Sequence, residues 1–112
     1  DEMTNYTSTM NFCVTNGKYI LCSRYINNDN EIPPSLYMCI GEEYVLENKN
    51  TYMRKMDEKN SDERKSENIN YNKKCIIIAS EPIDCYEKNW QLIPKNTMLS
   101  IDNNFNIEYL KL

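Results

Sequence analysis

The run of five apolar residues at Cys75–Ala79 constrains the fold of this chain more than any other segment. Its sequence, CIIIA, is apolar at every position, which is typical of a β-strand covered on both faces. We therefore expect this strand at the centre of a sheet. No stretch of the 112-residue chain shows the periodicity of an amphipathic helix, so helices that cover such a strand would have to come from elsewhere.

Most of the remaining sequence predicts short antiparallel strands separated by turns. Asn16-Gly17 lies between two β-prone segments and is typical of a tight hairpin. The second of these segments has apolar residues on both faces, so we expect cover on both sides. Further turns are predicted at 47–50 and 95–96, and the alternating last strand is predicted at a sheet edge. The expected strands are residues 10–15, 18–25, 35–40, 44–46, 51–56, 75–79, 90–94, 97–101 and 105–110.

Residues 57–74 differ in character from the rest of the chain. They carry mixed charges and many asparagines, with few large apolar side chains, and this composition is typical of a mobile, low-complexity insertion. A short helix over 61–67 is the alternative, but it would have no apolar stripe with which to dock.

Composition excludes several classes of function. The formal net charge of -4 gives no basic surface for nucleic acid, and no apolar run approaches the roughly 20 residues of a membrane-spanning helix. The chain has five cysteines and no histidine, which argues against a zinc site and excludes catalytic arrangements that need histidine; we assign no metal-binding residue. We expect free thiols, a cytoplasmic location and no cofactor.

Two kinds of side chain could nevertheless carry chemistry. Glu42-Glu43, or Glu81 with Asp84, could act as paired carboxylates, although acids at strand ends are more often solvated surface. Cys75 follows two lysines, which favour a reactive thiolate, but its place at the start of an apolar strand favours core packing. We assign no catalytic residue from these patterns.

Arg24, Ser80 and Glu81 are the candidates for lining a substrate cleft. Arg24 ends a mostly apolar strand, where a guanidinium more often pairs with a carboxylate or with backbone carbonyls. Ser80 and Glu81 follow the apolar strand, where polar groups either cap a turn or face a cleft. Both interpretations stay open for each of the three residues.

Five short motifs follow one another along the chain: MNFCVTNG at 10–17, SRY at 23–25, SLY at 35–37, IASEPI at 78–83 and WQLIPKNT at 90–97. In this order they resemble NFxx(T/S)DG, (T/V)RY, SLYY, (I/V)ASEPL and Wxx(I/V)PxN of the YafJ-like class II glutamine amidotransferases, a group that includes a glutathione-degrading amidotransferase subunit of fungi. The resemblance covers residues 10–56 and 75–112, with 57–74 as an insertion.

The resemblance implies an α+β fold, the four-layer αββα sandwich of the N-terminal-nucleophile (Ntn) hydrolases. In that family a cysteine at the mature N-terminus attacks the γ-amide of glutamine and forms a thioester. The sequence begins with Asp1, and the family's glutamine-binding elements lie mostly outside the matching motifs. No catalytic residue can therefore be transferred to this chain.

We accordingly expect residues 1–112 to form a single unit, the C-terminal portion of a type 2 glutamine amidotransferase domain. Its role would be structural, and it would be inactive alone. The expected partners are the missing N-terminal half of the domain and a peptidase-like or synthase subunit. The alternative is a non-enzymatic β-sandwich module that binds a protein partner through exposed tyrosine and asparagine side chains.

Overall fold

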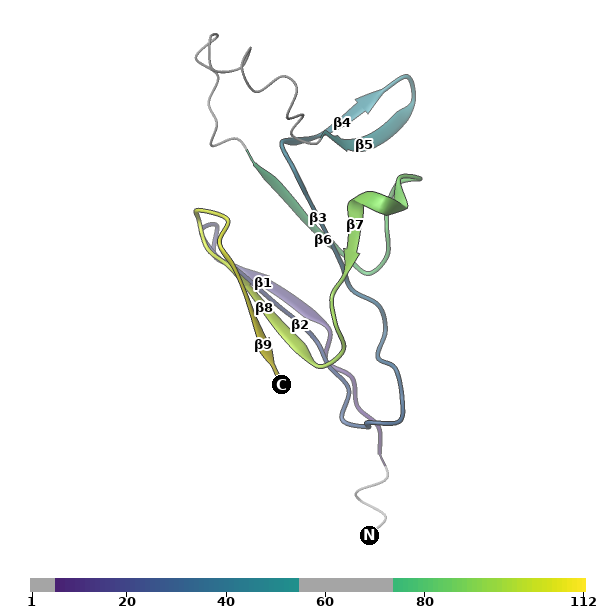
Figure 1. Cartoon of the computed structure of the whole chain (residues 1–112), viewed down its shortest axis with the longest axis vertical. Helices are drawn as coiled ribbons and strands as arrows, with labels where there is room; N and C mark the ends of the chain where they lie inside the picture. The colour runs from purple at the N-terminus through teal and green to yellow at the C-terminus, as the bar shows by residue number, and fades with distance from the viewer. Residues whose placement is uncertain (1–5, 55–73) are drawn as a thin grey trace.

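The computed structural model describes residues 6–54 and 74–112. Every strand pairing in them is antiparallel, which confirms the prediction of a mostly antiparallel β chain. The only helical segment of these residues is one 3-10 turn, η3 (Glu87–Asn89). The strands (Figure 1) are β1 (Phe12–Thr15), β2 (Ile20–Arg24), β3 (Tyr37–Gly41), β4 (Glu43–Glu47), β5 (Asn50–Arg54), β6 (Cys75–Ala79), β7 (Trp90–Leu92), β8 (Thr97–Ile101) and β9 (Ile107–Lys111).

The strands form three sheets. A four-stranded sheet has the order β1-β2-β8-β9, a three-stranded sheet the order β6-β3-β7, and β4 and β5 form a separate hairpin. Figure 1 shows the hairpin beyond the three-stranded sheet, away from the four-stranded one. The described residues contribute no α-helical layer, so they do not by themselves provide the αββα arrangement that the resemblance implies.

The two larger sheets pack against each other through one face each, which we call their inner faces. The register of the strands places Cys22 beside Leu99 on the inner face of the four-stranded sheet, and both are fully buried. Facing them, Met38 comes from β3, the middle strand of the other sheet. The buried residues of this core are Cys22, Leu36, Met38, Ile93, Leu99 and Ile101, with Ile20, Ile40, Ile76, Ile78 and Ile107 packed around them.

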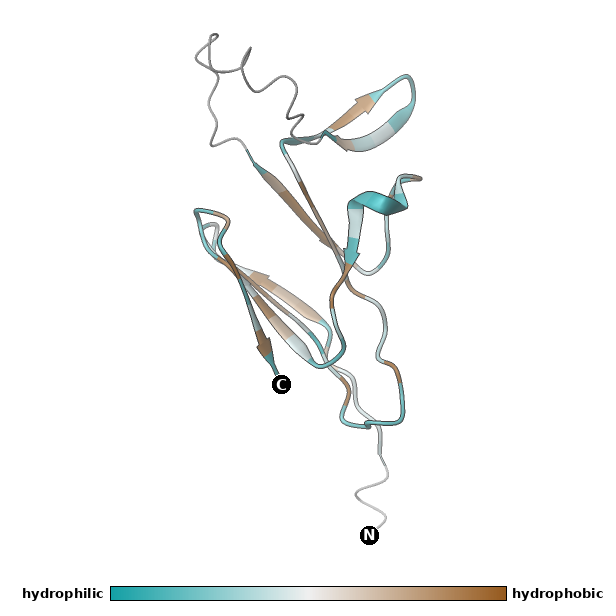
Figure 2. Cartoon of the chain, in the orientation of Figure 1, coloured by the Kyte–Doolittle hydropathy of each residue, from teal (hydrophilic) through white to brown (hydrophobic). Residues whose placement is uncertain are grey.

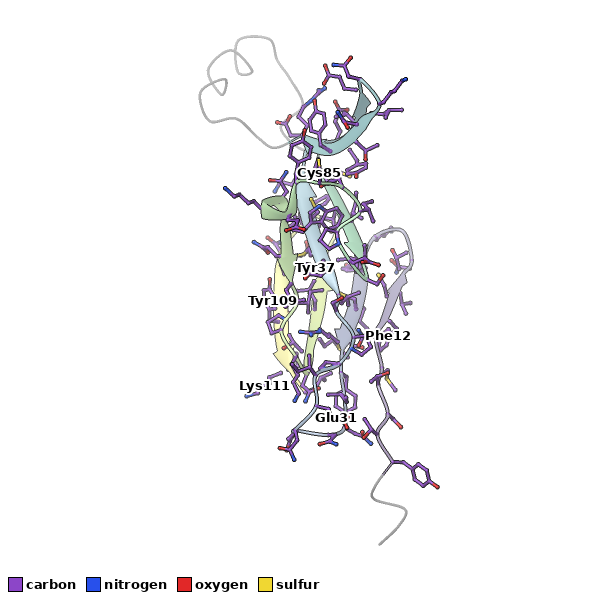
Figure 3. All side chains as sticks on the ribbon, turned by 90° about the vertical axis from the view of Figure 1, so that its right-hand side faces the viewer. Phe12, Glu31, Tyr37, Cys85, Tyr109 and Lys111 are labelled. Atoms are coloured by element: carbon purple, nitrogen blue, oxygen red, sulfur yellow. The ribbon has the colours of Figure 1, made fainter. Side chains whose placement is uncertain are left out.

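The opposite face of the four-stranded sheet, its outer face, is largely exposed. Tyr19 and Leu21 are 51% and 38% exposed, so the prediction that β2 is covered on both sides is wrong for the described chain. Figure 2 shows hydrophobic residues on β1 and β9, at the two edges of this sheet. Figure 3 shows Phe12 of β1 and Tyr109 of β9 on opposite sides of the molecule; by register Phe12 belongs to the outer face, whereas Tyr109, opposite Leu99, belongs to the inner face. By register, the apolar side chains of the outer face are Phe12, Val14, Leu21, Met98 and Leu110.

β6 is not the central strand that its composition predicts. The middle of the three-stranded sheet is β3, and β6 forms one edge. All five residues of β6 are half-buried. An apolar run creates a need for cover on both faces but does not determine which strands pair, and no described strand lies on the far side of β6.

The hairpin between β1 and β2 is confirmed, but its turn is shifted by one residue. The register pairs Thr15 with Ile20, so Gly17 and Lys18 occupy the centre of the turn. Gly17 has φ +92°, as a type II′ turn requires at its first central position. The Asn16 side-chain oxygen accepts hydrogen bonds from the backbone N–H groups of Lys18 and Tyr19, both at 2.9 Å.

The turn between β8 and β9 extends further than the sequence indicates. Phe105, predicted to begin the last strand, has φ +63° and lies in the turn, so β9 starts at Ile107. The Asp102 carboxylate accepts hydrogen bonds from the backbone N–H groups of Asn104 and Asn106, at 2.8 and 2.9 Å. The bonds from these asparagines lower the pKa of Asp102 below its usual 3.8. The prediction that the last strand is a sheet edge is confirmed.

The β4–β5 hairpin lies against the end of β3. Its turn, predicted at 47–50, is confirmed, with positive φ at Asn48 and Lys49. Gly41 allows the close approach, because a Cβ there would collide with Met53 and lie 2.6 Å from the carbonyl oxygen of Arg54. Met53 is buried with Cys39 and Trp90 in a second, smaller core.

The insertion predicted at 57–74 lies outside the described residues except for Lys74 and stays a prediction. Within residues 6–54 and 74–112 no helix is long and apolar enough to span a membrane.

The core between the sheets leads to a stability prediction. Leu99→Ala should lower the free energy of unfolding by about 2–5 kcal/mol, because it removes buried atoms and leaves a cavity. Leu110→Ala, on the exposed outer face, should change it by less than about 0.5 kcal/mol when the protein is tested alone. Urea unfolding followed by circular dichroism measures both, and equal effects would contradict the assignment of inner and outer faces.

Candidate functional site

The three cleft candidates do not converge on one site. Arg24 is at the buried end of β2, whereas Ser80 and Glu81 are exposed just after β6. An indirect connection runs through residues 33–35. Arg24 donates to the carbonyl oxygens of Pro33 and Pro34, and the Ser35 hydroxyl donates to the carbonyl oxygen of Ser80 at 2.6 Å.

The Arg24 guanidinium is buried and surrounded by backbone carbonyls. Its Nε donates to Pro34 at 3.0 Å, its Nη1 to Ile93 at 2.9 Å and its Nη2 to Pro33 at 3.2 Å. These acceptors flank β3 and β7, so the side chain fastens β2 to the three-stranded sheet. A planar fork of N–H donors suits this geometry, and a single ammonium group does not.

Asp84 is the centre of a polar network that sequence analysis missed. Its Oδ1 accepts hydrogen bonds from the backbone N–H of Tyr86 at 2.8 Å and from the Trp90 indole at 3.1 Å. Its Oδ2 accepts one from the Tyr44 hydroxyl at 3.1 Å, and the Tyr44 oxygen in turn accepts a hydrogen bond from the Thr51 hydroxyl at 3.2 Å. This carboxylate therefore holds the segment after β6 against the β4–β5 hairpin.

The sequence carries only a weak signal for this network. Trp90 is the single tryptophan of the chain, and a buried indole N–H usually finds an acceptor. Nothing in the spacing of Asp84, Tyr44 and Trp90 indicates that they meet, because the contact crosses from the hairpin to a segment some 40 residues later.

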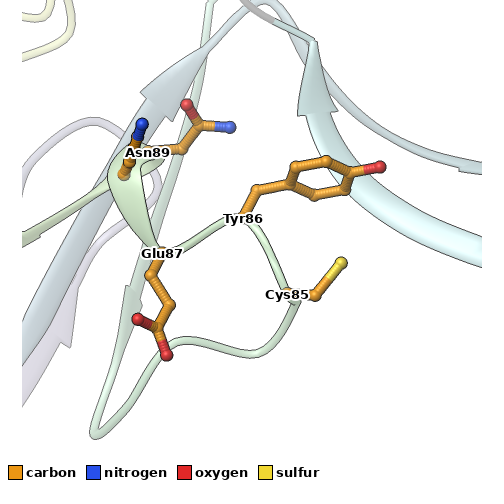
Figure 4. A pocket seen from close by; sticks show the side chains of 5 residues that line it. Cys85, Tyr86, Glu87 and Asn89 are labelled. Atoms are coloured by element: carbon orange, nitrogen blue, oxygen red, sulfur yellow. The ribbon is translucent and has the colours of Figure 1, made fainter.

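A shallow pocket of about 470 Å³ lies beside this network (Figure 4). It is lined by the consecutive residues Cys85, Tyr86, Glu87, Lys88 and Asn89. The Tyr86 ring meets Tyr52 of β5 edge to face, with 5.9 Å between the ring centroids. Since one stretch of chain supplies all the described lining residues, no groups from separate described elements converge in this pocket.

The cysteines differ in burial. Cys22 and Cys39 are buried, Cys75 is half-buried, and Cys13 and Cys85 are exposed. Cys75 packs against the smaller core with Cys39. Burial, with a smaller contribution from the neighbouring Cys13, raises the pKa of Cys22 to about 11.

The described part of the chain shows neither a metal-binding cluster of cysteine and acidic residues nor an assembled nucleophile and base. Asp84 is engaged by three donors, and the chain has no histidine. In class, this is an antiparallel β protein of two packed sheets whose polar side chains mainly fasten its segments together.

Comparison with known proteins gives one similarity to a curated protein. The chain is 30% identical over 101 residues to the probable glutamine amidotransferase DUG3 of Saccharomyces cerevisiae, a match covering 90% of this chain and 25% of that protein. The chain therefore spans about a quarter of the length of the curated relative it matches. No family model and no solved structure matches it. The similarity relates the chain to a glutamine amidotransferase.

The geometry of Arg24 predicts that lysine cannot replace it. Arg24→Lys should lower the free energy of unfolding by about 2–4 kcal/mol, because it leaves buried carbonyls without donors. Arg54→Lys is the matched control, since Arg54 pairs with Glu43 while half exposed, and it should cost less than about 1 kcal/mol. An unchanged urea midpoint for Arg24→Lys would show that the three carbonyl contacts do not stabilise the fold.

The Asp84 network predicts a local effect on Trp90. Asp84→Ala should remove the acceptor of the indole N–H and loosen the segment after β6, lowering the free energy of unfolding by about 1–3 kcal/mol. The fluorescence of Trp90 should shift to longer wavelength as the ring gains contact with water. Glu81→Ala, at an exposed position nearby, should leave the emission spectrum unchanged, and identical spectra for both variants would contradict the network.

Proposed function

We propose that this chain forms the C-terminal portion of a class II, YafJ-like glutamine amidotransferase domain. The complete domain would hydrolyse glutamine or γ-glutamyl amides through a cysteinyl thioester, and this segment would have a structural role. The observation that supports the proposal most is the pair of packed sheets whose other faces keep apolar side chains in contact with solvent.

The outer face of the four-stranded sheet is the stronger part of this observation. Val14 and Leu110 are 57% and 61% exposed, and Leu21 lies directly opposite Val14. Ser23, Ser100 and Glu108 share this face, but a group of exposed apolar side chains on one sheet face is more typical of an interface than of a free surface. Since strands alternate their side chains between two faces, one layer of helices would cover these residues without disturbing the inner core.

The three-stranded sheet supports the same arrangement. Ile77 and Ala79, on the side away from the inner core, stay half-buried, and Leu92 is 48% exposed. The fully apolar strand β6 forms an edge, although such strands are usually covered on both faces. Additional strands and a second layer of helices from the rest of the polypeptide would complete an αββα sandwich around these two sheets.

In this proposal the catalytic groups come from outside the matched motifs. A cysteine thiol would attack the γ-amide carbon of glutamine, ammonia would leave, and water would hydrolyse the thioester. Arg24 would hold the two packed sheets in their relative positions beneath the site. Ser80 and Glu81, exposed at the end of β6, are proposed as cleft-lining residues without a catalytic role.

Two further parts of the proposal concern the cellular location of the protein and its partner subunit. No disulfide joins the five cysteines in the structure, and reduced thiols are usual in a protein of the cytoplasm. A peptidase-like or synthase subunit is the proposed partner of the domain. The location and this partner both stay predictions.

The alternative function is a non-enzymatic module that binds a protein partner. The same apolar outer face favours it, because a flat patch of this kind also suits a separate protein. The two functions differ in what covers the face: the cysteine-bearing segment of an amidotransferase, or an unrelated chain.

Association with the remaining part of the domain tests the proposal. The tagged chain, co-expressed with the amidotransferase segment that carries the N-terminal cysteine, should retain that segment during purification and release glutamate from glutamine. Leu21→Asp should weaken the association at least about tenfold, because a charge buried in an apolar interface is strongly unfavourable. Ile32→Asp is the matched control, since Ile32 is 81% exposed in a loop and should behave as wild type.

Circular dichroism of the Leu21→Asp chain should match wild type, because Leu21 is exposed in the isolated chain. Failure of the wild-type chain to retain the cysteine-bearing segment would contradict the amidotransferase proposal. Capture of a different protein that depends on Leu21 would then favour the interaction module.

A further inference from the structure

Cys13 and Cys22 lie directly opposite each other on neighbouring strands. The register pairs Cys13 of β1 with Cys22 of β2, so both side chains point to the same face of the sheet. Side chains of directly opposed residues in antiparallel strands have their Cβ atoms about 4.5–5.5 Å apart. The two thiols are therefore neighbours, although they are nine positions apart in the sequence.

The hydrogen-bond pattern of the hairpin defines this pair further. The Met10 N–H donates to the carbonyl of Tyr25 at 2.9 Å, and the Asn16 N–H donates to the carbonyl of Tyr19 at 3.4 Å. Hydrogen-bonded and non-hydrogen-bonded pairs alternate along antiparallel strands. Pairs 10/25 and 16/19 are hydrogen-bonded, so the hydrogen-bonded pairs between them are 12/23 and 14/21. Cys13 and Cys22 lie between these two pairs and therefore form a non-hydrogen-bonded pair.

This type of pair brings two cysteines within bonding range. Non-hydrogen-bonded partners have Cα atoms about 4.5 Å apart, and disulfides span Cα separations of about 4.4–6.8 Å. The two sulfurs could be joined without moving the backbone far. The separation lies at the short end of the range, which is typical of a bond that is easily reduced again.

The two thiols also differ in access in a way that suits an exchange reaction. Cys13 is exposed, whereas Cys22 is fully buried. A small disulfide in solution can therefore reach Cys13 first. Cys22 can then act only on a sulfur already attached to its neighbour.

We propose that Cys13 and Cys22 form a reversible cross-strand disulfide by exchange with a low-molecular-weight disulfide. The Cys13 thiolate attacks one sulfur of that disulfide, forming a mixed disulfide and releasing one thiol. The Cys22 thiolate then attacks the Cys13 sulfur, which forms the protein disulfide and releases the second thiol. The protein loses two protons and two electrons, and the small disulfide gains them.

Other pairings within the chain fit less well. Cys39 lies opposite Ile77, and Cys75 lies opposite Gly41, so these two cysteines occupy diagonal rather than facing positions. Cys85 lies outside the strands, beside the shallow pocket. The cross-strand bond would have a defined effect, because among the described strands β1 is an edge strand that pairs with β2 alone. It would hold β1 and its outer-face residues Phe12 and Val14 in place.

Peptide mapping of the folded full chain tests this proposal independently of its function. Trypsin cleaves after Lys18 and Arg24, so Cys13 and Cys22 fall on separate peptides, 1–18 and 19–24, that stay joined only through a disulfide. After exchange with oxidised glutathione, blocking of free thiols and digestion, we expect the joined peptide, about 2 Da lighter than the sum of its two parts. Dithiothreitol should separate it.

Cys13→Ser, at an exposed position, should abolish the joined peptide without unfolding the chain, and Cys85→Ser should retain it. Accumulation of only a mixed disulfide at Cys13 would overturn the proposal. Linkage of Cys22 to another cysteine, or no linkage at any ratio of oxidised to reduced glutathione, would overturn it as well.

Discussion

The buried guanidinium of Arg24 is the contact on which the arrangement of the two sheets depends. It joins the end of β2 to the carbonyls of Pro33, Pro34 and Ile93, which lie before β3 and after β7. The chain therefore enters and leaves the three-stranded sheet at points fixed to the four-stranded one. The inner core of Cys22, Leu99 and Met38 forms between them, so burial of apolar surface and satisfaction of polar groups support the same geometry.

Among the described residues, no further layer covers the outer face of the four-stranded sheet, and the β4–β5 hairpin covers only part of the corresponding face of the three-stranded sheet. The two-sheet core is well packed, with Leu99 and Cys22 fully buried, while Val14 and Leu110 are mostly in contact with solvent. The Cα radius of gyration, 17.4 Å, exceeds the roughly 13 Å of a compact domain of this length. Both features suit a segment whose apolar faces are completed by other parts of a larger domain.

The sequence predicted where the strands lie better than it predicted which strands pair with one another. Alternation and turn residues located the hairpins, because these signals act within a few residues. They did not reveal that β3 is the one described strand with which β6 pairs, since an apolar run requires cover without specifying a partner. Local patterns also misplaced single residues in turns: Phe105 has a strong strand propensity, but the hydrogen bonds to Asp102 place it at positive φ.

The candidate site was the part least accessible to sequence analysis. Arg24 was recognised as either a carbonyl partner or a cleft residue, and only coordinates show its three carbonyl acceptors. The Asp84 network joins residues from β4, β5 and β7, and no motif marks such long-range meetings. The relation to a glutamine amidotransferase was visible in the order of short motifs, which are local, whereas the role of each residue depends on the fold around it.

Mass spectrometry of the protein purified from its native source shows whether these sheets belong to a larger amidotransferase domain. Residues 1–112 are then expected to be attached to, or tightly associated with, a segment whose mature N-terminus is cysteine. A native species consisting of these 112 residues alone, with no such segment bound, would contradict this expectation.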